Sequence, residues 1–135
     1  MNMKTLRYWI PTVLAALALT GSGVMNVLSP DMLLEVMAHL EFPAWFPRWL
    51  GMWKLAGVAV LLAPGLPRLK EWATAGFTIS LTSAAVAHIA VGDPIDGVIA
   101  PLVILGLVLT SWHFRPDSRR LAGPSQAPSA QPQVA

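Results

Sequence analysis

Long apolar runs separated by short polar breaks dominate the chain. Four runs are long enough, at about 1.5 Å of helical rise per residue, to approach the roughly 30 Å hydrocarbon core of a bilayer. They cover residues 8–27, 49–66, 72–91 and 97–114. The second run is the weakest because Lys54 lies inside it, but 55–63 is continuously apolar or small. The pattern predicts an all-α integral membrane four-helix bundle.

The breaks between the runs are too short for a soluble domain. Residues 31–42 place Leu33, Met37 and Leu40 on one side of a helix and charged residues on the other, which predicts a short amphipathic interfacial helix between spans one and two. Residues 64–68 and 92–94 contain proline and glycine and are expected to form tight turns.

The end of the chain differs from the rest. Residues 121–135 are rich in proline, serine and glutamine and have no apolar periodicity. Such a segment has too little hydrophobic surface to offset the entropy lost on ordering. The sequence therefore predicts a four-span membrane domain over 1–120 and a disordered cytoplasmic tail over 121–135.

Composition agrees with a lipid environment. Of the 135 residues, 55% are hydrophobic and 12% are charged, whereas about a quarter of residues are charged in a typical soluble domain. The chain has no cysteine, which excludes disulfides, thiolate metal sites and cysteine nucleophiles. The formal charge of +2 does not indicate nucleic-acid binding, because the cations lie at the ends of apolar runs.

The cations divide unevenly between the two ends of the runs. If the N-terminus is cytoplasmic, only Arg48 and Lys54 lie near the outer side. The cations then on the cytoplasmic side are Lys4, Arg7, Arg68, Lys70, Arg115, Arg119 and Arg120. Because cytoplasmic loops carry the excess of Lys and Arg, both termini are expected in the cytoplasm. A competing interpretation makes the first run a cleaved secretory signal, which would leave three spans, but the run lacks a good small-residue cleavage site.

Ionisable side chains inside a bilayer are costly, so Lys54 and His88 are the first candidates for function. Both lie near the outer ends of their spans, at the level of Asn26, and Asp93 follows in the adjoining turn. We expect a ligand-binding cluster of Lys54, His88, Asp93, Asn26 and Trp53 at the outer mouth of the bundle. The alternatives are that Lys54 only extends its ammonium to the interface and that His88 only bonds a backbone carbonyl.

Other polar and small residues are assigned structural roles. Gly76, Ser80, Ala84 and His88 recur every fourth residue and predict a face for close helix packing. Arg68, Lys70, Glu71 and Trp72 are expected to form a solvated cytoplasmic cap. Neither a metal site nor haem ligation is expected, because the histidines and carboxylates lack ligand spacing. No catalytic residue is identified.

Several segments together carry a family resemblance. They are LGMWKLAG at 50–57, LLAP at 61–64, PRLKEWATAGF at 67–77, AHIAVGD at 87–93 and Arg115-Pro116. Over about residues 5–120 the chain resembles the DoxX-like family of small four-helix membrane proteins. The resemblance implies a multi-pass protein of the bacterial inner membrane, some of whose relatives work beside redox enzymes. A typical member has Tyr where this chain has Thr74, so no role of that ring carries over.

These observations lead to a functional hypothesis with two rivals. We expect a small membrane component of a redox or stress-response system that binds a quinone or lipid-like ligand and contacts a membrane or redox protein. A non-catalytic scaffold that binds a membrane partner through small-residue faces is the alternative. A small-molecule transporter is less favoured, because the chain has no internal repeat and no acidic residue near the centre of the membrane.

Overall fold

Residues 2–121 are described by the structure, a computed structural model. This range is all-helical, with turns between the helices and without strands. Its elements are α1 (Met3–Leu28), α2 (Asp31–His39), α3 (Phe46–Leu62), α4 (Pro67–Ala90), α5 (Ile95–His113) and the short 3-10 helix η1 (Asp117–Arg119). The tail predicted to be disordered lies outside the described residues, apart from Leu121.

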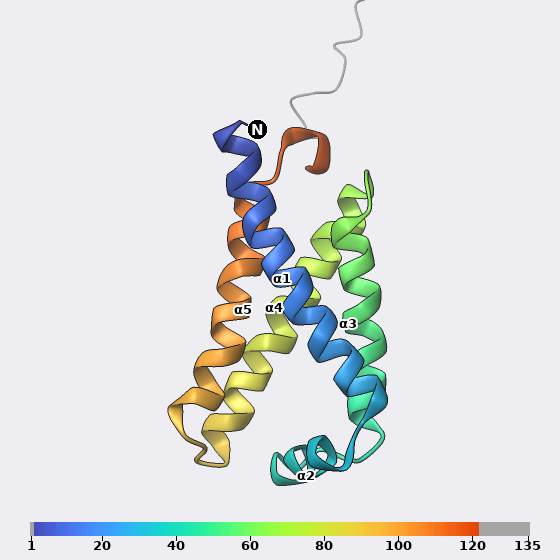
Figure 1. The fold of residues 1–135 in the computed structure, drawn as a ribbon, viewed down its shortest axis with the longest axis vertical. Coiled ribbons are helices and arrows are strands. Elements are labelled where there is room, and N and C mark those ends of the chain that lie inside the picture. The colour runs from blue at the N-terminus through green and yellow to red at the C-terminus, as the bar shows by residue number, and fades with distance from the viewer. Residues whose placement is uncertain (1, 122–135) are drawn as a thin grey trace, which may run out of the picture.

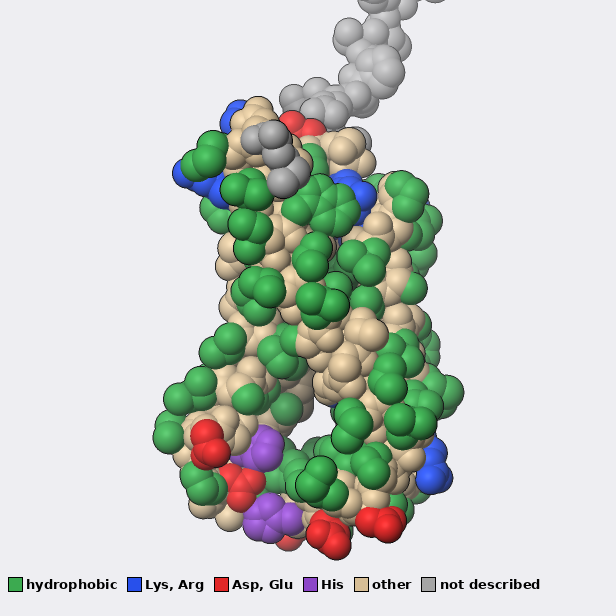
Figure 2. All heavy atoms as spheres, viewed as in Figure 1, with side chains coloured by type: hydrophobic (Ala, Val, Ile, Leu, Met, Phe, Trp, Pro, Cys, Tyr) green, Lys and Arg blue, Asp and Glu red, His purple; other side chains and the backbone are tan. Residues whose placement is uncertain are grey.

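The four long helices form one bundle (Figure 1). α1 runs diagonally across it and packs against α3 and α5, and α4 packs against α5 and α3. The start of α1, the α3–α4 turn and η1 lie together at one end, whereas α2 and the α4–α5 turn lie at the other (Figure 1). We call the end with η1 the basic end, because it holds the seven cations grouped above. We call the end with α2 the acidic end, which holds Asp31, Glu35, Glu41, Asp93 and Asp96. Figure 2 shows this separation of charge.

Three of the described helices are long and apolar enough to cross a membrane: α1, α4 and α5. They correspond to the first, third and fourth predicted spans. α3 overlaps the second predicted span but has 17 residues, which at about 1.5 Å per residue gives roughly 25 Å. Three of the four predicted runs therefore coincide with candidate membrane spans, and the fourth crossing stays a prediction.

Helix boundaries extend beyond the apolar runs. α1 begins at Met3, capped by the Asn2 side chain, and not at residue 8. α4 begins at Pro67, whereas the sequence placed 64–68 in a turn and started the span at 72. Proline is favoured in the first turn of a helix because no helical hydrogen bond needs its missing N–H. The structure thus adds one turn to α4, and this turn carries Lys70 and Glu71.

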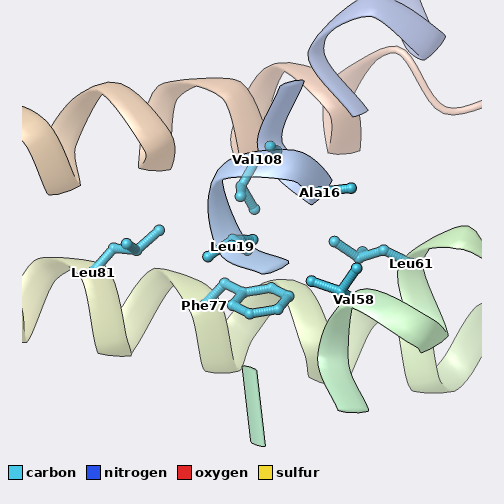
Figure 3. Close-up of a cluster of buried hydrophobic side chains, with 8 residues drawn as sticks. Ala16, Leu19, Val58, Leu61, Phe77, Leu81 and Val108 are labelled. Atoms are coloured by element: carbon cyan, nitrogen blue, oxygen red, sulfur yellow. The ribbon is translucent and has the colours of Figure 1, made fainter. Parts of the chain in front are cut away.

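The hydrophobic core lies where α1 crosses the other helices. Leu19 of α1 packs among Val58, Phe77 and Val108, which come from α3, α4 and α5 (Figure 3). α1 and α3 approach each other closely at Gly51. A Cβ on this glycine would stand only 2.7 Å from the carbonyl oxygen of Gly23. In lipid, such small-residue contacts allow the helix backbones to approach each other.

Candidate functional site

A groove lies between α3 and α4. Its volume is about 460 Å³, within the usual size of small-molecule sites, about 300–1,000 Å³. The lining residues are Phe46, Trp49, Leu50, Trp53, Lys54, Ala56, Gly57, Val60, Leu69, Trp72, Ala73, Gly76, Phe77 and Ser80. Apart from the tryptophan indoles, the polar side chains among them are Lys54 and Ser80. The groove is therefore apolar, with one cationic side chain in its lining.

Small residues leave the space that forms the groove. Gly57 of α3 lies against the ring of Phe77, where a Cβ would stand 2.6 Å from Cζ. Gly76, which directly precedes Phe77 on α4, lines the groove, and a Cβ there would meet nothing within 4 Å. The face of α4 that was predicted for close helix packing is therefore open at Gly76. That prediction is wrong at this position, because spacing alone does not reveal how far away the neighbouring helix lies.

Lys54 is held by α1 and not by the acidic loops. Its side chain is half-buried, and its Nζ donates a hydrogen bond to Oγ of Ser22 at 2.8 Å. Trp53, which precedes it on α3, is exposed, lines the groove and makes an edge-to-face contact with Trp49. The ammonium thus keeps two of its three N–H donors for another acceptor.

Asp93 joins two histidines at the acidic end. Oδ2 of Asp93 lies 2.6 Å from Nδ1 of His88, and Oδ1 lies 2.7 Å from Nε2 of His39. The hydrogen bonds from His88 and then His39 hold the pKa of the Asp93 carboxyl below its usual value. The cluster ties α2 to the α4–α5 turn. Figure 2 shows histidine and acidic side chains beside an opening at this end of the molecule.

The predicted outer cluster is only partly assembled. His88 and Asp93 are in contact, and Trp53 and Lys54 share the groove. Lys54 and Asp93 do not pair with each other in the described chain, because the carboxylate oxygens bond histidines and the ammonium bonds Ser22. His88 is not among the groove-lining residues.

Asn26 occupies a separate buried position on α1. Its side chain is 4% exposed, and its Nδ2 has no hydrogen-bond partner among the described residues. It does not line the groove. The structure therefore does not connect Asn26 with Lys54 or with His88.

At the basic end, Lys70 is buried and not solvated as predicted. It is 1% exposed, and its Nζ donates hydrogen bonds to the carbonyls of Val60, Leu61 and Ala63 at 2.5, 2.9 and 2.5 Å. The last carbonyls of a helix lack intrahelical donors and carry partial negative charge. The Lys70 ammonium satisfies these carbonyls at the end of α3 and so joins α4 to α3.

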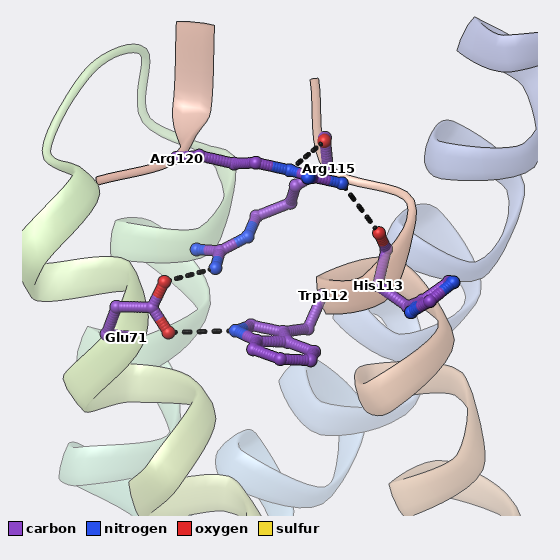
Figure 4. Close-up of polar contacts among 5 residues, drawn as sticks. All are labelled: Glu71, Trp112, His113, Arg115 and Arg120. Atoms are coloured by element: carbon purple, nitrogen blue, oxygen red, sulfur yellow. Dashed lines mark hydrogen bonds and ion pairs between the residues drawn. The ribbon is translucent and has the colours of Figure 1, made fainter. Parts of the chain in front are cut away.

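Glu71 connects α4 to the end of α5. It accepts a hydrogen bond from Nε1 of Trp112 at 2.8 Å (Figure 4). It also forms an ion pair with Arg115, whose side chain is 5% exposed. Of the other residues assigned to the cap, Arg68 is exposed and Trp72, at 79% exposure, lines the groove. Lys70 and Glu71 of the predicted cap thus connect α4 to α3 and α5, whereas Arg68 and Trp72 are exposed.

Three residues of these sites were not identified from the sequence. Ser22 and Trp112 were assigned no role, and Arg115 appeared only among the cytoplasmic cations and in one segment of the family resemblance. Helical spacing gave no signal for them, because each acts through a partner on another helix. One signal was available: Arg115 directly follows an apolar helix, where a cation has to find a carboxylate or the headgroup region.

Comparisons with known proteins bear on the fold and not on the chemistry. Residues 10–111, most of the chain, match the sequence model of the DoxX-like family. No curated protein and no solved structure matches the chain.

Proposed function

The chain belongs to the DoxX-like family, and we propose that it binds a quinone or another lipid-like ligand in the α3–α4 groove, as a small membrane component of a redox or stress-response system. The observation that carries this proposal is a lone ammonium, Lys54, in a groove whose walls are otherwise almost wholly apolar. Ligand sites of this type combine apolar walls with a few polar groups that fix orientation.

The chemistry of the groove suits a ligand with a polar head and an apolar tail. Lys54 donates one hydrogen bond to Ser22, so its remaining N–H groups are available to a carbonyl oxygen of a ring or to an ester. Leu69, Ala73 and Phe77 offer apolar contacts along α4 for a prenyl or acyl chain. Trp53, beside Lys54, offers a flat face for a ring.

The proposed site is smaller than the cluster expected from the sequence. His88 is engaged by Asp93 and does not line the groove. Head-group recognition is therefore assigned to Lys54, with Ser22 as the residue that positions its ammonium. His88 and Asp93 are assigned to the link between α2 and the α4–α5 turn.

The proposal includes a membrane topology. We place all four long helices across a bacterial inner membrane, with the basic end and both termini in the cytoplasm. Seven of the nine cations of the chain lie at that end, as expected for the cytoplasmic side. α3 is slightly short, but Trp49 near its start and Trp72 on the neighbouring α4 are placed to anchor this pair of helices at the two interfaces.

The test is mass spectrometry of organic extracts from protein purified in mild detergent. We expect a stoichiometric isoprenoid or lipid species in the wild type and its loss in Lys54→Met. Arg48→Met, which removes an exposed cation from the first turn of the same helix, is the matched control and is expected to retain the ligand. Bulk phospholipid alone in all three samples would contradict the proposal and favour the scaffold alternative.

A further inference from the structure

The basic end contains a buried guanidinium that is only partly neutralised. One terminal nitrogen of Arg115, Nη2, pairs with Glu71, whereas Nε and Nη1 are closed off from solvent and have no hydrogen-bond partner within residues 2–121. Figure 4 shows that the terminal nitrogen of Arg115 that does not bond Glu71 points away from Trp112. Buried donors without acceptors are rare in folded proteins and cost free energy, and more so when they carry charge.

Other cations lie close to Arg115. The charges of Arg119 and Arg115 both act on the ammonium of Lys70, and Arg120 donates from Nε to the Arg115 carbonyl at 2.7 Å. In the part of the chain that the structure describes, Glu71 is the one carboxylate that pairs with an arginine or lysine. The site therefore carries more positive charge than its protein partners balance.

Backbone carbonyls neutralise some of these cations but not Arg115. Lys70 directs its ammonium to three carbonyls at the end of α3, and Arg120 caps carbonyls that follow α5. Arg119 bridges from Tyr8 Oη at 3.2 Å to the carbonyls of Leu61 and Ala63, both at 3.5 Å. Among the described residues at this end, the buried donors without a partner therefore belong to Arg115.

We propose that the basic end binds a phosphate-type oxyanion between Arg115 and Arg119. A guanidinium presents paired N–H groups in a fixed fork that matches the oxygens of phosphate. The Nε edge of Arg115 is the part of the fork without an acceptor, and Arg119 is a second guanidinium that is only half-buried. The groove proposed for the lipid-like ligand contains neither residue, so the two proposals stand independently.

Entry of the anion requires a neighbouring side chain to move, because Nε and Nη1 of Arg115 are covered. Arg119 is the most suitable one, since its bonds to the two α3 carbonyls are long. When Arg119 turns from those carbonyls, its N–H groups become available to the same oxyanion. The phosphate can belong to an anionic lipid headgroup of the adjoining leaflet or be free in solution.

The test measures binding to full-length protein in detergent by native mass spectrometry and by titration. The probes are phosphatidylglycerol, phosphatidylcholine and inorganic phosphate. The variants are Arg115→Gln, Arg119→Gln and, as a matched control, Arg68→Gln, which removes an exposed cation from the same end. Arg119→Gln leaves the Arg115–Glu71 pair intact, so the test survives if Arg115→Gln fails to fold.

We expect phosphatidylglycerol to bind saturably and Arg119→Gln to weaken its binding about tenfold, with Arg68→Gln close to wild type. Binding of phosphatidylglycerol alone identifies a lipid headgroup as the source of the anion, and binding of inorganic phosphate as well shows that the free ion suffices. The proposal is overturned if neither anionic probe binds saturably, if phosphatidylcholine binds equally well, or if Arg68→Gln weakens binding as much as Arg119→Gln.

Discussion

Gly57 of α3 and Phe77 of α4 lie in such close contact that a Cβ on the glycine would stand 2.6 Å from Cζ of the ring. Phe77 is buried in the core and also lines the groove. This contact sets the distance between α3 and α4 at the point where the groove meets the packed core. It therefore controls both stability and the shape of the proposed site.

Gly57→Ala is expected to destabilise the protein, because the added methyl group displaces a buried ring, at a cost of about 1–3 kcal/mol. The better helix propensity of alanine offsets roughly 0.5–1 kcal/mol of this. Gly76→Ala, at the residue directly before Phe77 on α4, gains the same propensity with nothing within 4 Å of the new methyl group. Thermal unfolding in detergent should rank Gly76→Ala above Gly57→Ala, and equal midpoints would show that the contact does not constrain the helices.

Gly76→Leu tests the groove without altering its cation. The new side chain would occupy open space against the groove, so we expect loss of the co-purified ligand with little change in thermal stability. Gly106→Leu on α5 is the control, since that glycine also has open space around it but does not line the groove. If extracts from Gly76→Leu hold as much ligand as those from Gly106→Leu, the ligand does not occupy the α3–α4 groove.

Lys70→Met removes the ammonium that satisfies three carbonyls at the end of α3. Hydrogen bonds to a charged group contribute about 1.5–3 kcal/mol, and buried carbonyls left without donors add a penalty. We expect a loss of roughly 3 kcal/mol, measured by unfolding in mixed detergent micelles. Arg68→Met, two residues earlier and exposed, should change stability little, and similar losses in the two variants would indicate a general effect of charge.

The contrast between these two cations shows the limit of sequence reasoning here. Arg68 and Lys70 stand in the same charged segment, and both were expected to be solvated. Proline and glycine in residues 64–68 predicted the turn after α3, but not that Lys70 rather than Arg68 would reach the last carbonyls of that helix. Hydrophobic length did locate the four long helices, because runs of this kind have few alternatives in lipid. Amphipathic spacing located the short helix between the first two.

The same limit applies to the candidate site. Lys54 was identified as an unusual residue because a charge inside an apolar run is costly, and it does line the groove. Its partner Ser22 lies on another helix, 32 residues earlier in the chain, and depends on how α1 crosses α3. His88 contacts Asp93 but does not line the groove with Lys54, since residues at one depth in a membrane can face different sides of the bundle.

Asp93→Asn is expected to lower stability in a pH-dependent way. Because the histidine bonds hold the pKa of the Asp93 carboxyl below its unfolded value, its stabilising effect is present above about pH 4 and is lost as the pH falls through the lower folded-state pKa. The melting temperature of the wild type should exceed that of Asp93→Asn at pH 7, and the two should converge in strong acid. Asp96→Asn, an exposed carboxylate nearby, should show no such convergence.

Thr12 and Ser111 form a buried hydrogen bond between α1 and α5, with their oxygens 2.6 Å apart. Thr12 donates its own proton to the Tyr8 carbonyl at 2.5 Å, so Ser111 must be the donor in the pair. Thr12→Val and Ser111→Ala should each destabilise the bundle, and a double-mutant cycle should give a coupling of about 0.6–1.7 kcal/mol, as for hydrogen bonds between membrane helices. Additive losses would mean that α1 and α5 are held together by apolar packing alone.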